Sequence, residues 1–215
     1  MQYTVLPRQA VSSQAATAIR SMILDGVIPD GERINEVHLS QQLGVSRTPI
    51  REGLGQLVAD QFVNFIPRRG FFVRELSVAE FSDLYDMRPM LDPQALLIGG
   101  QPTEREIILI DEANDQFLNA QSNVESVSTD ETFHRCLIKR CPNQVLLELI
   151  DHLMVRTKRY ELALFRESEP VQTAQNEHAN IIKALRDQNL EQAAEHLRQN
   201  LTSGKAPIVA WLSAR

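Results

Sequence analysis

Long apolar runs and cysteines are scarce in this sequence of 215 residues. No stretch approaches the roughly 18 apolar residues of a membrane-spanning helix, and the first ten residues lack the basic region and apolar core of a signal peptide. The two cysteines are too few for a disulfide framework, and their spacing fits no zinc motif. We therefore expect a cytoplasmic protein without a membrane partner.

Lysine is absent from residues 1–76, where eight arginines accompany seven acidic residues. Residues 77–215 carry 14 basic and 21 acidic residues, so most of the net charge of −6 lies there. This asymmetry predicts two domains with different partners, divided near residue 76. The first can bind DNA if its arginines share one face, whereas the acidic second domain repels phosphate.

The first domain alternates helical and strand-like patterns. Apolar spacing and turn residues predict three helices and then two short strands joined by a turn with glycine, at 9–24, 36–43, 47–59, 62–66 and 71–74. This order is typical of a winged helix-turn-helix, whose third helix enters the major groove of DNA.

Strand signals are nearly absent after Ser77. Helical periodicity, interrupted by glycine, proline and asparagine, predicts six helices at 77–98, 103–120, 125–140, 143–167, 171–188 and 190–213. Short connections between such helices favour an antiparallel bundle. The fold class is therefore mainly α: an N-terminal winged helix-turn-helix domain, 1–76, and a C-terminal all-helical bundle, 77–215.

The start of the third helix carries side chains suited to DNA. Arg47 and Arg51 lie four residues apart and share a face, and an arginine can donate two hydrogen bonds to guanine. The hydroxyls of Ser46 and Thr48 suit phosphate oxygens. Arginines in the turn between the strands can enter a minor groove. The alternative is that these arginines are merely solvated.

Two segments, LGVSRTPIREGLGQL and FIPRRGFFVRELS, resemble the GntR family of bacterial transcription regulators, and so does the preceding stretch from Ile19. The resemblance implies a homodimer that binds double-stranded, near-palindromic operator DNA. By the same resemblance, the operator-contacting residues are Arg33, Arg47, Thr48, Arg51, Arg69 and Gly70. Gly53 and Gly55 depart from the family pattern of alanine and a basic or bulky residue. Each costs a helix about 1 kcal/mol relative to alanine, so we expect the third helix to be less stable when free. We also expect a phosphate contact near Gly55 to be missing.

Polar residues stand at helical spacing in the second domain. Asp130 and His134 are four residues apart in TDETFHRCL, as are His196 and Asn200, and His178 lies on another predicted helix. A carboxylate and imidazoles from several helices can form a metal site in a bundle core. The alternative is a surface ion pair or hydrogen-bonded core histidines.

The motifs around His134 and His178 resemble the FCD effector domain of the FadR-like GntR subfamily, in which Asp and three His bind a divalent metal. Asp130, His134 and His178 match directly, and the fourth position falls on Asn200. This implies a site for Zn²⁺, Ni²⁺ or a similar ion, weakened because an amide oxygen is a poorer ligand than imidazole. Alternatively, His196 takes the fourth position, or the site holds no metal.

Two arginines are candidates for binding an effector. Arg88 matches a family arginine that lines the effector pocket, and a guanidinium pairs naturally with a carboxylate. Arg156 follows the inward-facing Leu153 by three residues, although it can equally be a surface side chain. We expect the Tyr160 hydroxyl to face the pocket. The predicted effector is a small organic acid.

These features predict a ligand-responsive DNA-binding regulator, by resemblance a repressor, and not an enzyme. Three alternatives remain, one of which is a DNA-binding scaffold with no ligand and a bundle without a pocket. In a metal-responsive regulator the metal itself is the signal, and in a metal-dependent hydrolase the metal activates water. The hydrolase is less favoured, because the sequence shows no general base beside the cluster.

Overall fold

A computed structural model describes residues 8–167 and 174–215. The chain divides into two compact units, Met1–Leu76 and Ser77–Arg215, and the predicted fold class is confirmed. Part of the ten-residue N-terminal segment, the turn at Glu169-Pro170 and the first residues of the predicted helix 171–188 lie outside the described residues. None of the described helices combines the length and hydropathy that a membrane span requires.

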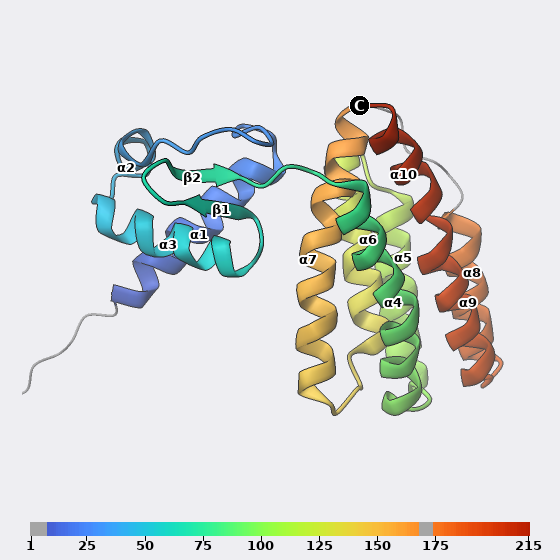
Figure 1. The fold of residues 1–215 in the computed structure, drawn as a ribbon. Coiled ribbons are helices and arrows are strands. Elements are labelled where there is room, and N and C mark those ends of the chain that lie inside the picture. The colour runs from blue at the N-terminus through green and yellow to red at the C-terminus, as the bar shows by residue number, and fades with distance from the viewer. Residues whose placement is uncertain (1–7, 168–173) are drawn as a thin grey trace, which may run out of the picture. The chain divides into compact units, whose positions relative to one another are not determined.

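The first unit is built from α1 (Arg8–Leu24), α2 (Glu36–Leu43), α3 (Arg47–Ala59), β1 (Val63–Ile66) and β2 (Gly70–Val73) (Figure 1). Asn35 caps α2, because its side chain accepts hydrogen bonds from the backbone of Val37 and His38. Gly44 ends α2 with a φ of 66°, a left-handed conformation that suits glycine. This turn sets α3 against α2 in the helix-turn-helix arrangement.

The two strands pair antiparallel, with Val63 opposite Val73 and Ile66 opposite Gly70. The segment before α2 extends this small sheet, because Arg33 forms a bridge with Phe72 and Ile34 N donates to Phe71 O at 2.8 Å. The wing is therefore fixed to the segment that leads into the helix-turn-helix.

Gly53 lies where α3 crosses α1. A Cβ at this position would lie 2.9 Å from both Ala16 N and Ser12 O, which is closer than real Cβ contacts. Gly55, two residues later, is exposed, and a Cβ there would have no neighbouring atom within 4 Å. The expectation that both glycines weaken α3 is therefore wrong for Gly53, because its missing side chain permits the close packing of two helices.

The two glycines give a matched prediction. We expect Gly53→Ala to lower the free energy of unfolding by about 1–3 kcal/mol, because the extra methyl group forces the two helices apart. Gly55→Ala should raise it by about 1 kcal/mol, because alanine favours the helix and meets no neighbour. Scanning calorimetry of both variants measures this, and a stabilising Gly53→Ala would contradict the packing argument.

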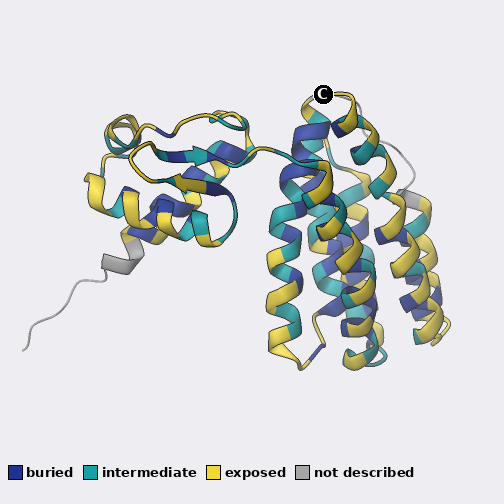
Figure 2. Ribbon diagram, in the orientation of Figure 1, coloured by how far each residue is buried: buried dark blue, intermediate teal, exposed yellow. Residues whose placement is uncertain are grey.

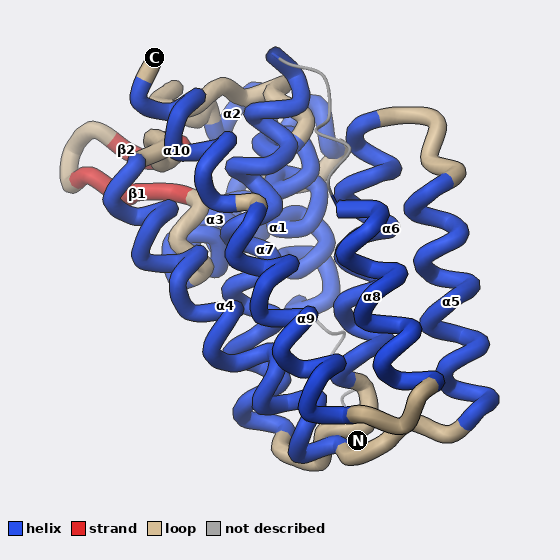
Figure 3. Tube along the Cα trace, turned by 90° about the vertical axis from the view of Figure 1, so that its right-hand side faces the viewer, coloured by secondary structure: helices blue, strands red, loops and turns tan. Residues whose placement is uncertain are grey.

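The second unit contains seven helices among the described residues: α4 (Val78–Gly99), α5 (Glu104–Leu118), α6 (Asn123–Ile138), α7 (Gln144–Glu167), α8 (Ala174–Arg186), α9 (Leu190–Ser203) and α10 (Lys205–Ser213). Six of them form a closed ring in the order α4, α7, α6, α5, α8, α9, and α10 packs on the end of α4, α7 and α9 (Figures 1 and 3). Buried residues line the inside of this ring (Figure 2).

The prediction of one helix over 190–213 is wrong, because the chain breaks into α9 and α10 at Gly204. Pro207 has no N–H to donate to the carbonyl four residues earlier, so the helix cannot continue unchanged. Gly204 also lies against Tyr85, whose hydroxyl would overlap a Cβ at this position. The break brings α10 over the end of the bundle, where it helps to enclose a cavity.

Candidate nucleic-acid interface and metal centre

The N-terminus of α3 presents the predicted DNA-contacting side chains to solvent. Ser46, Arg47, Thr48 and Arg51 are all exposed. Ser46 occupies the N-cap position, yet its side chain makes no capping hydrogen bond. This leaves the hydroxyl and the first N–H groups of α3 free of a cap, which suits a phosphate oxygen.

Glu36 in the first turn of α2 lies beside both arginines of α3. Its Oε2 is 3.9 Å from Arg47 Nη2 and 3.7 Å from Arg51 Nε, and it makes no hydrogen bond. The side chains of Arg47 and Arg51 remain 61% and 56% exposed, so this loose ion pairing leaves their donors available.

The structure brings the remaining predicted DNA-contacting residues together at the wing. Gly70 has a φ of 100°, and a Cβ on this residue would lie 3.9 Å from Arg33 Nε. Arg69 is exposed, with its guanidinium carbon 5.2 Å from the centre of the Phe72 ring. Arg33 thus belongs to the wing surface, a grouping that the sequence did not reveal.

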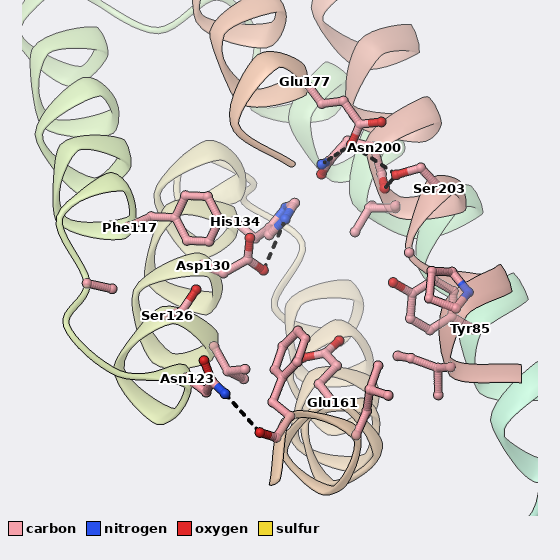
Figure 4. A pocket seen from close by; sticks show the side chains of 18 of the residues that line it. Tyr85, Phe117, Asn123, Ser126, Asp130, His134, Glu161, Glu177, Asn200 and Ser203 are labelled. Atoms are coloured by element: carbon pink, nitrogen blue, oxygen red, sulfur yellow. Dashed lines mark hydrogen bonds and ion pairs between the residues drawn. The ribbon is translucent and has the colours of Figure 1, made fainter. Parts of the chain in front are cut away.

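A cavity of about 450 Å³, partly open to solvent, lies in the helical unit. All seven helices of this unit contribute lining residues, from Tyr85 on α4 to Ile208 on α10. Its polar and charged lining residues include Arg88 and, labelled in Figure 4, Tyr85, Asn123, Ser126, Asp130, His134, Glu161, Glu177, Asn200 and Ser203.

Three of the four predicted metal ligands form one cluster, and two of the three, Asp130 and His134, line the cavity. Ligand atoms of Asp130, His134 and His178 all lie within 4.8 Å of one another. His134 Nε2 is 3.6 Å from Asp130 Oδ2, and His178 Nε2 is 3.4 Å from Asp130 Oδ1. Both imidazoles are buried, with 3% and 0% of the residue exposed.

Neighbouring side chains hold His178 in one orientation. Its Nδ1 lies 3.1 Å from Asn114 Oδ1, and its ring stacks on Phe133 with 3.9 Å between centroids. Because an amide oxygen only accepts hydrogen bonds, this pairing keeps the proton on Nδ1. The lone pair of Nε2 then faces Asp130, and Nε2 is a buried atom without a hydrogen-bond partner.

The protonation states of the cluster also suit a cation. Burial lowers the pKa of His134 to about 3, with Arg88 and His178 adding to the effect against Asp130. Burial tends to raise the pKa of Asp130, but the nearby His134, His178 and Arg88 hold it below its usual value. A neutral imidazole at His134 and an ionised carboxylate at Asp130 are the forms that bind a metal, so these two residues suit a divalent ion.

The two candidates for the fourth ligand differ in position. Asn200 is buried and lines the cavity, its Nδ2 donates to Glu177 Oε2 at 2.9 Å, and its Oδ1 has no hydrogen-bond partner. His196, one turn earlier on α9, is half-buried and is not among the cavity-lining residues.

The two predicted effector-binding arginines also differ. Arg88 lines the cavity; its Nη2 donates to the buried Asp92 at 2.8 Å, and its Nε has no partner. Arg156 is not among the lining residues, because it pairs with Glu80 at the start of α4. The expectation for Tyr160 is wrong, since its hydroxyl donates to Glu80 at 3.2 Å.

Glu161 is a cavity residue that sequence reasoning missed. It lies on α7 and makes no hydrogen bond or ion pair with any described residue. Burial, with a smaller contribution from the charge of Asp130, raises its pKa to about 7. Figure 4 shows Asp130, Glu161 and Tyr85 around one space from three helices. The only sequence signal was a charged residue within the apolar face of a long helix.

The raised pKa of Glu161 predicts a pH-dependent cost to the protein without metal or effector. The unfolded carboxyl ionises near pH 4.5, so the cost appears as pH rises from there and is complete above about 7. We expect Glu161→Gln to raise the free energy of unfolding by about 2 kcal/mol at pH 8 and by much less at pH 5. Denaturant titration measures both values. Glu148→Gln on the exposed face of α7 is the control, and equal stability of Glu161→Gln and wild type at pH 8 would contradict the argument.

Comparison with known proteins finds one family match in each unit of the chain. Residues 11–73 match the family of bacterial regulatory proteins named gntR, and residues 83–203 match the FCD domain. These two ranges contain every residue placed above at the DNA surface and at the metal cluster.

The similarity to known proteins extends over most of the chain. The Nta operon transcriptional regulator of Aminobacter aminovorans is 32% identical over 167 residues, which cover 76% of this chain and 78% of that protein. The transcriptional repressor GlaR of Escherichia coli is 23% identical over 203 residues, or 89% of this chain and 92% of that one. The solved structure of E. coli McbR/YncC has a similar fold, with a TM-score of 0.81 and 21% identity over 94% of this chain and 98% of that chain. The chain is thus a DNA-binding transcription regulator that belongs to the GntR family and carries an FCD domain.

Proposed function

We propose that this regulator is a repressor whose helical domain binds a divalent metal and a small carboxylate effector. Two chains bind a near-palindromic operator through Arg47, Thr48 and Arg51 in the major groove. Ser46 contacts phosphate, and Arg33, Arg69 and Gly70 form the wing contact. Repressors among its relatives, such as GlaR, support the sign of regulation.

The observation that carries the proposal is the cluster of Asp130, His134 and His178, of which Asp130 and His134 line the cavity. In a metal complex these three residues leave coordination positions open, and the carboxylate of an effector can occupy them. The unpartnered Nε of Arg88 can donate to a carboxylate oxygen, and Asn200 can supply the fourth ligand through its Oδ1. Because Arg156 pairs with Glu80, we leave it out of the proposed effector site.

Selection of binding sites from a random duplex DNA pool tests the DNA-binding part of the proposal. The purified protein, loaded with Zn²⁺ or Ni²⁺, should enrich an inverted repeat whose half-sites lie about one helical turn apart. Failure to enrich any sequence, with or without metal, would contradict the proposal and favour the metal-dependent hydrolase.

A further inference from the structure

The cavity has more negative than positive charge among its described lining residues. Asp130, Glu161 and Glu177 are acidic, and the one basic lining side chain, Arg88, is already paired with the buried Asp92. A divalent ion at Asp130 compensates part of this charge. An effector that carries only carboxylates would restore the excess negative charge, which is unfavourable where side chains partly shield the site from water.

The cavity also presents hydrogen-bond acceptors that lack donors. Glu161 makes no hydrogen bond or ion pair within the described residues, although the charges of Arg88 and Lys158 act on it. Asn200 Oδ1, on a residue only 8% exposed, has no hydrogen-bond partner. Glu177 differs, because Asn200 Nδ2 and Ser203 Oγ both donate to it at 2.9 Å. A carboxylate group supplies no donor to Glu161, whereas an ammonium group supplies up to three and a positive charge.

We propose that the effector is an amino-carboxylate whose carboxylate binds at the metal and whose protonated amine donates to Glu161. This inference rests on the proposed function, because it assigns the ligand class of the same cavity. Glu161 is then the residue that distinguishes an amino acid from the matching hydroxy acid or simple acid. Figure 4 shows how this carboxylate and Asp130 lie at one space, so a small molecule can reach both.

Calorimetry with matched acids tests the proposal on the full chain loaded with Zn²⁺. The probes are three series that differ only in a hydrogen, hydroxyl or amino group at one carbon: propionate, lactate and alanine; succinate, malate and aspartate; glutarate, 2-hydroxyglutarate and glutamate. In at least one series, the amino member should bind at least tenfold more tightly than both others. Glu161→Gln should remove this preference, whereas the same change at the exposed Glu148 should preserve it.

Each other outcome overturns the inference. A hydroxyl or unsubstituted member that binds as tightly as its amino partner in every series shows that the cavity does not select an amine. The inference is also overturned if no amino member binds, or if a folded Glu161→Gln protein keeps the preference for the amino member. If the protein binds Zn²⁺ and simple carboxylates without preferring an amine, the proposed function still holds and only this inference fails. The two failures can therefore be distinguished.

Discussion

Replacement of His178 by alanine is expected to lower the affinity for Zn²⁺ or Ni²⁺ by at least about 100-fold. The His178 Nε2 lone pair faces Asp130, and the imidazole is completely buried between Phe133 and Phe117. No described histidine outside the cluster lines the cavity to replace it. Loss of an outer partner of a metal ligand alone costs about 10–100-fold, so loss of the ligand itself should cost more.

Calorimetric titration with either ion measures this effect. Asn114→Leu should weaken binding by about 10–100-fold, because Asn114 fixes the orientation of His178. His152→Ala, an exposed histidine on α7, is the control and should bind as wild type. Equal metal affinity of His178→Ala and His152→Ala would rule out the proposed ligand set.

The fourth ligand can be assigned in the same titration. Asn200→His should bind Zn²⁺ more tightly than wild type, because imidazole is a better ligand for this ion than an amide oxygen. Asn200→Ala should bind more weakly, and His196→Ala should be unchanged. A loss of affinity in His196→Ala with none in Asn200→Ala would assign the fourth position to His196.

Arg47→Ala should weaken binding to the selected operator by about 2–6 kcal/mol in a dimer. An arginine with two hydrogen bonds to a guanine contributes about 1–3 kcal/mol, and the dimer loses one such contact in each half-site. The Arg47 side chain is well exposed and only loosely paired with Glu36, so it is free to make this contact.

Fluorescence anisotropy with the selected duplex measures this loss. Arg105→Ala removes the same charge from an exposed position on α5 and should leave the affinity near wild type. Wild-type affinity should also fall steeply as salt increases, because phosphate contacts release counterions. An Arg47→Ala protein that binds as tightly as Arg105→Ala would show that α3 does not read the operator.

Local sequence patterns predicted the helices and strands, and they predicted which residues share a face within one helix turn. The four-residue spacing of Asp130 and His134 placed them on one face of α6, and Asn35 marked the start of α2. Gly204 and Pro207 were also visible signals, and the break between α9 and α10 could have been predicted from them.

Contacts between helices could not be predicted from periodicity. The pairing of Arg156 with Glu80, and the position of Glu161 at the cavity that Asp130 also lines, depend on which helices are neighbours in the ring. The role of Gly53 likewise depends on the close approach of α1. Helix propensity describes α3 in isolation and cannot predict that contact. The match of His178 to the cluster required the family resemblance, because His134 and His178 lie 44 residues apart on different helices.

The central claim is that the metal and effector site in the helical domain controls DNA binding. Operator affinity measured by anisotropy in three states tests it: without metal, with Zn²⁺, and with Zn²⁺ plus the acid that calorimetry shows to bind best among the nine. Our account predicts that the acid lowers the affinity about tenfold or more, and only when Zn²⁺ is bound. An equally large loss of operator affinity with Zn²⁺ alone would identify a metal-responsive regulator. An operator affinity that is equal in all three states would contradict the account.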